Sequence, residues 1–286
     1  MRVRAPARPR PPASHKTKYP SERRRPFAAL VPPAVCAGGG PALCSHPASD
    51  YDGITDGRGS KGGTMFKFWG DGSQQSKDLV DAIVVRSTDN FNWTFIFILA
   101  VVFYVYWSEI HKREFKVIFA GLALYGVHWF YEICNAIIGH VAGYPLWSVS
   151  NESTTFILLI GVCWELSMMF ALAGIISYKM LPADPNARYF ARDGRGGVSA
   201  KLVGAISMAL LFALVESFLA ATSNGSFLWV YRWWGVLPVF VTTYIPFFLA
   251  SNYVPDWEPA RRTRFLAGIW GIDALLLVVL IPLGII

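Results

Sequence analysis

Long apolar stretches separated by short polar segments dominate this sequence from residue 91 onwards. A helix needs about 20 mostly apolar residues to cross the hydrocarbon core of a bilayer. The pattern therefore predicts an all-α, multi-pass transmembrane helix bundle of about six spans. We place these spans near residues 91–108, 116–138, 154–178, 201–222, 236–253 and 265–286. Before the first span, charged and apolar residues alternate from Asp78 to Asp89, which indicates a short amphipathic helix on the membrane surface.

Lys and Arg residues in the connecting segments predict which side of the membrane each segment faces. They gather after the first, third and fifth spans, whereas the connection after the second span has none and that after the fourth has only Arg232. Because positively charged loops stay on the cytoplasmic side, we expect both chain ends outside. Aromatic residues such as Trp147 and Trp229 are then expected at the outer membrane interface.

Composition divides the chain into a basic tail and a neutral body. Residues 1–64 hold eleven Lys and Arg against four Asp and Glu, and ten of the eighteen prolines, whereas the remaining chain holds fifteen residues of each charge. The tail, rich in Pro and Arg, is predicted to be disordered. Three interpretations stay open: a basic arm on anionic lipids, an organelle transit peptide, or an untranslated stretch before a true start at Met65. Residues 65–90 are predicted to be a juxtamembrane or amphipathic segment, and residues 91–286 the six-helix transmembrane domain.

The composition of the whole chain supports an integral membrane protein, most simply of a plasma or inner membrane. Only 16% of the residues are charged, against about 25% in average soluble domains. Since the net charge of +7 lies in the tail, no nucleic-acid partner is expected. The four cysteines form no C-x-x-C motif, so the sequence predicts neither a zinc site nor a redox pair, and no cofactor is expected.

Ionisable residues inside the predicted spans locate a candidate site. They are Glu132, Glu165, Glu216 and Asp273, with His128 near the middle of the second span. A charged side chain at the bilayer centre costs roughly 2.5–3.5 kcal/mol on insertion scales and nearly always faces the bundle interior or a water-filled cavity. A protonated buried carboxyl can serve as a general acid and an ionised neighbour as its base. We expect Glu132, Glu165, Asp273 and His128 to be the acid–base groups of one pocket in the outer half of the membrane.

Other side chains are predicted to bind and orient a substrate. His128, Glu132 and Asn135 follow i, i+4, i+7 spacing and share one helix face, with Tyr131 beside them. The predicted binding residues are Asn135, Glu216, Tyr131, Trp164 and Thr243. Aromatic faces stabilise carbocations, so the many tryptophans would suit an isoprenoid. No Glu-x-x-His motif is present, and a metal site is not predicted.

The sequence thus favours a pocket that binds or acts on a lipid-like molecule by acid–base chemistry, with membrane lipids around it. Two alternatives stay open. A proton- or cation-coupled transporter would use the same carboxylates as a relay, although the inner half offers few polar groups beyond Ser177 and Asn252. A non-catalytic subunit of a membrane complex would pack them against a partner, because buried polar side chains also join helices structurally.

Overall fold

The computed structural model describes residues 65–286 apart from 90, 92, 94, 151–155, 185, 191–195 and 224. The predicted tail, residues 1–64, lies outside the described residues. The elements in chain order are α1 (Gln74–Asp81), α2 (Phe95–His111), α3 (Phe115–Ala142), β1 (Trp147–Val149), β2 (Ile157–Leu159), β3 (Val162–Cys163), α4 (Trp164–Lys179), β4 (Arg188–Tyr189), β5 (Val198–Ser199), α5 (Ala200–Thr222), β6 (Phe227–Trp229), α6 (Val236–Pro238), the π-helical η1 (Val239–Tyr244), α7 (Ile245–Tyr253), the 3-10 helix η2 (Val254–Asp256) and α8 (Pro259–Leu280).

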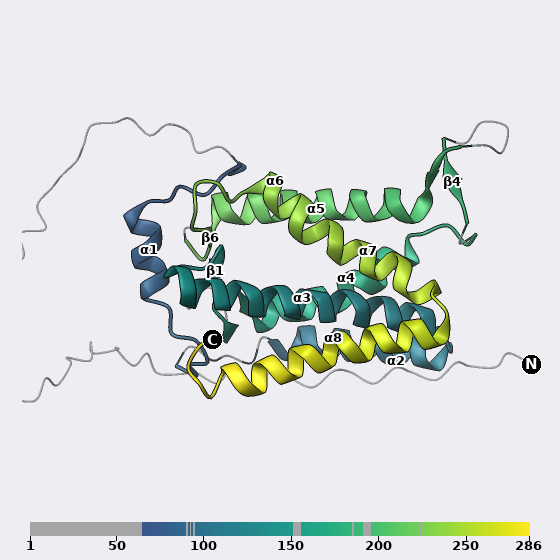
Figure 1. Ribbon diagram of the computed structural model, residues 1–286, viewed down its shortest axis with the longest axis horizontal. Helices are drawn as coiled ribbons and strands as arrows, with labels where there is room; N and C mark the ends of the chain where they lie inside the picture. The colour runs from purple at the N-terminus through teal and green to yellow at the C-terminus, as the bar shows by residue number, and fades with distance from the viewer. Residues whose placement is uncertain are drawn as a thin grey trace, which may run out of the picture. The chain divides into compact units, whose positions relative to one another are not determined.

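Helices running back and forth form a bundle, which confirms the predicted fold class (Figure 1). The long helix α3 contacts α2, α4, α7 and α8. Gly121 of α3 and Gly174 of α4 let two of these backbones approach closely, since a side chain on Gly174 would meet the carbonyl oxygen of Ala120. Small residues have this role at many helix contacts in membranes.

The number of spans stays a prediction. Among the described residues, four helical segments are long and apolar enough to cross a membrane: Phe115–Ala142, Ala200–Thr222, Val236–Asp256 and Pro259–Leu280. Phe95–His111 is a shorter apolar helix, and α4 has only 16 residues. All six segments nevertheless alternate in direction along the bundle (Figure 1).

The predicted third span, 154–178, is not helical over residues 156–163. The chain there forms a hairpin of β2 and β3, with Ile157 opposite Cys163, and α4 begins only at Trp164. Ile157, Leu159 and Val162 are buried. A short, fully buried apolar run is compatible with either a strand or a helix, because periodicity cannot separate the two.

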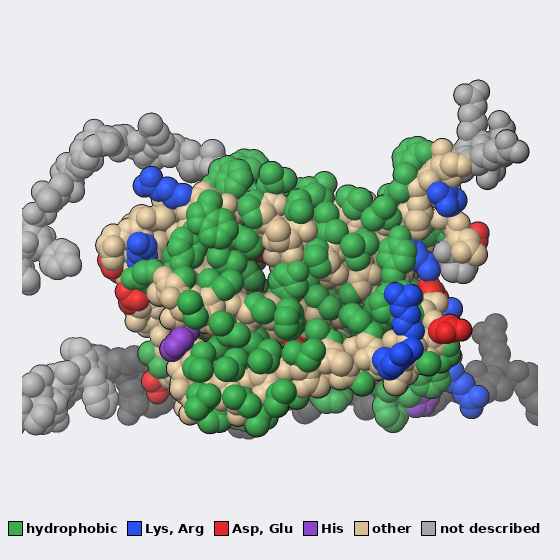
Figure 2. All heavy atoms as spheres, viewed as in Figure 1, with side chains coloured by type: hydrophobic (Ala, Val, Ile, Leu, Met, Phe, Trp, Pro, Cys, Tyr) green, Lys and Arg blue, Asp and Glu red, His purple; other side chains and the backbone are tan. Residues whose placement is uncertain are grey.

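The two ends of the bundle differ in character. One end, here called the strand end, carries α1, the β2–β3 hairpin and the antiparallel pair of β1 and β6, in which Trp147 lies opposite Trp229. The other, the basic end, is made of residues 112–114 and 254–258 and the described parts of the connection between α4 and α5, residues 180–184, 186–190 and 196–199. Figure 2 shows hydrophobic side chains over the middle of the bundle and Lys and Arg side chains gathered at the basic end.

The amphipathic helix expected at residues 78–89 begins earlier and is shorter, as α1. The side chain of Ser73 caps it by accepting a hydrogen bond from the Ser76 backbone N–H at 3.1 Å. Close by, Arg86 donates hydrogen bonds to the backbone oxygens of Leu158 (3.1 Å) and Ile286 (3.0 Å). These hydrogen bonds hold the segment that follows α8 against the β2–β3 hairpin.

The fifth segment changes helix type before Pro246. In η1 the Ile245 N–H donates to the carbonyl of Phe240, five residues back. A proline has no N–H, and in a regular α-helix its ring would clash with the carbonyl four residues before it, here that of Thr242. The wider π-turn precedes this proline and places Thr243 and Tyr244 in the bundle core. Single π-turns are frequent at functional sites.

Candidate functional site

A small internal cavity of about 40 Å³ lies in the strand-end half of the bundle. One water molecule needs roughly 10–15 Å³ measured in this way, so the cavity holds only a few heavy atoms. Its polar lining comes from α3, α5, η1 and β1, and the other lining side chains are apolar or aromatic. The polar lining residues are His128, Glu132, Trp147, Glu216, Thr243 and Tyr244.

Glu216, from α5, is held by two strong donors. The Trp229 Nε1–H donates to one carboxylate oxygen at 2.6 Å, and the Tyr244 hydroxyl donates to the other at 2.5 Å. Hydrogen bonds to an ionised carboxylate are shorter and stronger than neutral ones. The geometry therefore suits Glu216 as a fixed acceptor.

Glu132, from α3, has a weaker set of contacts. The Trp147 Nε1–H is shared between its two oxygens, at 3.2 Å from each. The His128 Nε2 lies 3.5 Å from Oε1, one helical turn away. Because neither oxygen is saturated by a short hydrogen bond from the described residues, Glu132 is better placed than Glu216 to exchange a proton.

His128 is almost completely buried, with 1% of its surface exposed. Neither ring nitrogen makes a hydrogen bond to the described residues. Its ring stacks on Phe170, with the centroids 4.1 Å apart. An unpaired buried polar group costs about 1–3 kcal/mol, so this imidazole is poised to bind a polar group in the cavity. The Thr243 hydroxyl, which also lines the cavity, likewise has no partner in the described part of the chain.

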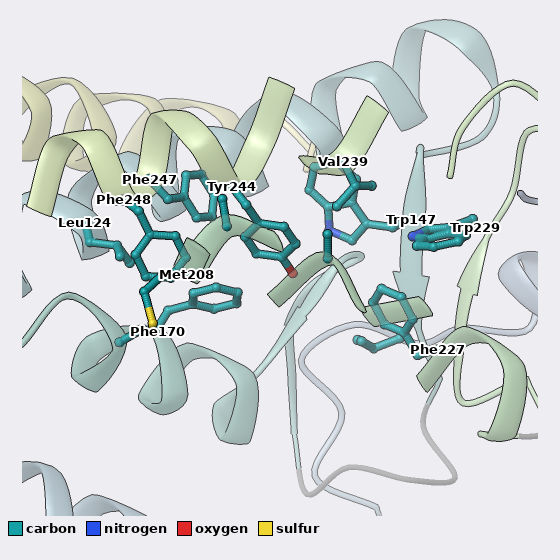
Figure 3. Close-up of a cluster of buried hydrophobic side chains, with 14 of the residues drawn as sticks. Leu124, Trp147, Phe170, Met208, Phe227, Trp229, Val239, Tyr244, Phe247 and Phe248 are labelled. Atoms are coloured by element: carbon teal, nitrogen blue, oxygen red, sulfur yellow. The ribbon is translucent and has the colours of Figure 1, made fainter. Parts of the chain in front are cut away.

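An apolar layer closes the cavity towards the basic end. In Figure 3, Tyr244 lies between a group formed by Leu124, Phe170, Met208, Phe247 and Phe248 and a second group formed by Trp147, Trp229 and Phe227. We call the first group the aromatic layer. On its far side, Ser177 donates a hydrogen bond to Asn252 at 2.9 Å. The aromatic layer thus separates two polar regions of the bundle.

Three of the five predicted binding residues do not line this cavity: Asn135, Tyr131 and Trp164. Asn135 is fully buried and holds the start of β1: its amide donates to the Trp147 carbonyl at 2.9 Å and its oxygen accepts from the Leu146 N–H at 2.8 Å. Tyr131 is half-buried and packs edge-on against Phe247. Both residues position the elements that form the cavity.

The remaining predicted site residues lie elsewhere. Glu165 is half-buried in the first turn of α4 and not in the middle of a helix. Its carboxylate is next to the start of a helix, where the helix dipole favours negative charge. Asp273 and Trp164 line a separate pocket beside α8. The four carboxylates therefore do not form one cluster.

Sequence reasoning missed the indole donors at this site. Trp147 and Trp229, expected at the membrane interface, are buried and bind Glu132 and Glu216. A buried tryptophan usually needs a hydrogen-bond acceptor for its N–H. The carboxylates inside the predicted spans could therefore have indicated that some tryptophans bind them. Gly161, in the β2–β3 turn, also lines the cavity. A side chain there would collide with the Trp147 indole and the Glu132 carboxylate.

Comparisons with known proteins place these features in a wider group. The model of an uncharacterized membrane protein family matches residues 74–282, a range that contains every residue lining the cavity. An uncharacterized protein from Archaeoglobus fulgidus is 36% identical over 200 residues, which covers 68% of this chain and 91% of that relative. No solved structure matches the chain.

Proposed function

Since the chain belongs to this uncharacterized membrane protein family, we propose that it is an integral membrane protein that binds a lipid-like molecule and exchanges a proton with it. His128 and Glu132 are the exchanging pair, and Glu216 fixes the site. The observation that carries the proposal is the shared cavity, lined by two buried carboxylates and by an imidazole whose nitrogens have no hydrogen-bond partner among the described residues.

The walls of the cavity favour a ligand that comes from the bilayer. Val215 of α5 lines the cavity although 43% of its surface is exposed. On that side a single layer of side chains separates the cavity from the surface that lipids would cover. The small volume suits one reactive end of a lipid-like molecule, such as an isoprenoid, with the rest of the molecule lying along the outside of α5.

The acid–base roles follow from the hydrogen bonds. Glu132 is 3.5 Å from the His128 Nε2, so a small movement allows a proton to pass between them. The other imidazole nitrogen, Nδ1, is available to a ligand atom. Glu216, held by two donors, is a fixed carboxylate position that in its ionised form would stabilise positive charge on the ligand or on the imidazole.

The test is to identify the molecule that purifies with the protein. The full chain is purified in a mild detergent, and bound hydrophobic molecules are analysed by mass spectrometry beside a Val215→Trp variant, in which the new ring fills the cavity. Leu211→Trp is the matched control, since Leu211 lies one turn away on α5 and is exposed. We expect the wild type and the control to carry a molecule that the filled variant lacks. Equal contents in all three proteins would contradict the proposal.

A second experiment separates reaction from binding. In Glu132→Gln the amide keeps the shape of the site and cannot accept a proton as the carboxylate does. A proton-transfer reaction predicts that this variant carries the unconverted form of the molecule found in the wild type. If both proteins carry the same molecule in the same form, the site binds without reacting.

The polar region beyond the aromatic layer favours a proton- or cation-coupled transporter as the second candidate. In that case the aromatic layer would open and close between the cavity and the Ser177–Asn252 pair. Proteoliposomes containing a pH-sensitive dye would then show a proton flux that Glu132→Gln reduces at least tenfold. A flux no larger than that of empty vesicles would exclude this candidate. For the third candidate, a structural subunit, Glu132→Gln would lower the melting temperature and change no bound molecule.

A further inference from the structure

Asp273 is a buried carboxylate on a helix at the outside of the bundle. Helix α8 lies against α3 and presents most of its surface outward (Figures 1 and 2). Among its 22 residues only Asp273 is buried, with 2% of its surface exposed. A peripheral helix in a membrane ordinarily packs through small or apolar side chains, so a carboxylate at this position calls for a partner.

No hydrogen-bond partner for either Asp273 carboxylate oxygen is found among the described residues. The side chain instead lines a pocket of about 430 Å³ between α8, α3, the β2–β3 hairpin and the start of α4. This pocket is distinct from the cavity at His128. Six of its eight lining residues are only half-buried and Ala274 is exposed, so the pocket reaches the side of the bundle that lipids would cover. The lining residues are Tyr125, Trp129, Leu158, Trp164, Trp270, Asp273, Ala274 and Leu277.

Four aromatic side chains line the same pocket as the Asp273 side chain, and neighbouring residues hold those of Tyr125 and Trp270 in place. The Trp270 Nε1–H donates to the carbonyl of Leu122 at 3.2 Å. The Tyr125 hydroxyl is 2.7 Å from that of Ser167, and the Tyr125 ring meets Trp270 edge-on at 5.5 Å. These contacts leave ring surfaces, rather than polar atoms, for a ligand.

The chemistry of this lining selects one class of ligand. Aromatic faces attract organic cations, and aromatic cages are a common site for quaternary ammonium groups. A carboxylate in the wall of the same pocket supplies the counter-charge. A hard metal cation such as Ca²⁺ takes six to eight oxygen ligands, whereas this pocket offers one carboxylate. We infer that Asp273 and the rings of Tyr125, Trp129, Trp164 and Trp270 form a binding site for an organic ammonium cation that enters from the membrane.

The experiment uses benzyltrimethylammonium as the probe and the full chain in dodecylmaltoside, an uncharged detergent without ammonium groups. Binding is measured by isothermal titration calorimetry and by ligand-observed NMR. We expect saturable binding that Asp273→Asn weakens at least tenfold and that Trp129→Leu weakens several-fold. Asp89→Asn, which removes an exposed carboxylate outside the pocket, is the matched control and should bind as the wild type does.

Two further measurements separate recognition of charge from apolar binding and from misfolding of a variant. Neopentylbenzene, the uncharged isostere of the probe, should not compete, because it lacks the charge that Asp273 recognises. Ala274→Trp should abolish binding by filling the pocket from an exposed position with every charge intact, and this variant decides the question if Asp273→Asn does not fold. Equal binding to wild type and Asp273→Asn, competition by the isostere, or unchanged binding to Ala274→Trp would each overturn the inference.

Discussion

At the residue scale, the hydrogen bonds of Glu216 predict an unequal effect of two substitutions. Glu216→Ala leaves the Trp229 Nε1–H and the Tyr244 hydroxyl without their acceptor, and each unsatisfied buried donor costs about 1–3 kcal/mol. Glu216→Gln keeps an oxygen for Trp229 and offers its NH₂ to the Tyr244 oxygen, so only the Tyr244 O–H loses its acceptor. We expect Glu216→Ala to lower the melting temperature in detergent more than Glu216→Gln. Equal melting temperatures for the two variants would show that these hydrogen bonds do not stabilise the fold.

Asp71, outside the helical segments, predicts a dependence of stability on acid pH. Partial burial raises the pKa of its carboxyl, but hydrogen bonds from Ser73 and Ser76 and the charge of Lys67 outweigh burial and lower the pKa from 3.8 to about 2. A lowered pKa in the folded state stabilises the fold above pH 3.8, and this contribution is lost as the pH falls towards 2. The melting temperature of the wild type should therefore fall between pH 3.8 and pH 2. The melting temperature of Asp71→Asn should be lower at pH 5 and fall less over this interval, and an equal fall in both proteins would contradict the lowered pKa of Asp71.

The sequence could predict part of the site because depth along a helix follows directly from residue number. This reasoning placed His128, Glu132 and Glu216 at similar depths, and the structure puts all three at one cavity. It could not predict which way each helix faces, so Asp273 was grouped with residues from which the structure separates it. Nor could it find the Trp147 and Trp229 donors, since their positions depend on the pairing of β1 with β6, which are far apart in the chain.

At the scale of elements, the β2–β3 hairpin predicts the effect of a single methyl group. The Cβ of Gly161→Ala would lie 2.5 Å from both the Asn135 Nδ2 and the Trp147 Nε1, and overpacking of this kind typically costs 1–3 kcal/mol. We expect a lower melting temperature and a displaced Trp147, seen as a shift in tryptophan fluorescence. Gly268→Ala is the control because nothing lies within 4 Å of its added methyl group. It should be neutral or stabilising, since alanine favours a helix by about 1 kcal/mol over glycine.

The same hairpin and η1 mark where the apolar pattern is least informative about structure. Residues 156–163 are apolar enough to continue a span, yet they fold as two short strands whose side chains are mostly buried. In the fifth segment, Pro246 signalled an irregularity without revealing its type. A π-turn adds a residue to the helix, and whether the chain adopts one depends on packing around Tyr244 that local sequence does not contain. The regular helices α3 and α5 were predicted closely because their apolar runs are long.

At the scale of the whole bundle, charges at the basic end join helices that are distant in sequence. The Asp256 carboxylate accepts hydrogen bonds from Lys116 of α3 at 2.7 Å, Lys201 of α5 at 2.6 Å and Tyr178 of α4 at 3.1 Å. A count of loop charges predicts a positive face, but not that one carboxylate forms ion pairs with lysines from two helices. This network holds the ends of α3, α4 and α5 against the end of α7. Since α3 and α5 also line the cavity, the network helps to fix their positions there.

Bundle and charge together predict the topology in the membrane. Six alternating segments return the chain to the strand end, where Arg86 binds the Ile286 carbonyl, and the basic end should face the cytoplasm. In a background in which the four native cysteines are replaced by serine, Asp78→Cys lies at the strand end and Asp184→Cys at the basic end, both at exposed positions. A membrane-impermeant maleimide should label Asp78→Cys in intact cells and Asp184→Cys only after permeabilisation.

The position of α4 makes this labelling decisive for the number of spans. With 16 residues, α4 is about 24 Å long at 1.5 Å per residue, shorter than the roughly 30 Å hydrocarbon core. In a six-span bundle the β2–β3 hairpin would supply the remaining depth, since non-helical backbone buried in protein is tolerated inside a bilayer. If α4 did not cross, positions 78 and 184 would lie on the same side and label together in intact cells. Labelling of both would therefore reject the six-span bundle and, with it, a cavity placed within the membrane.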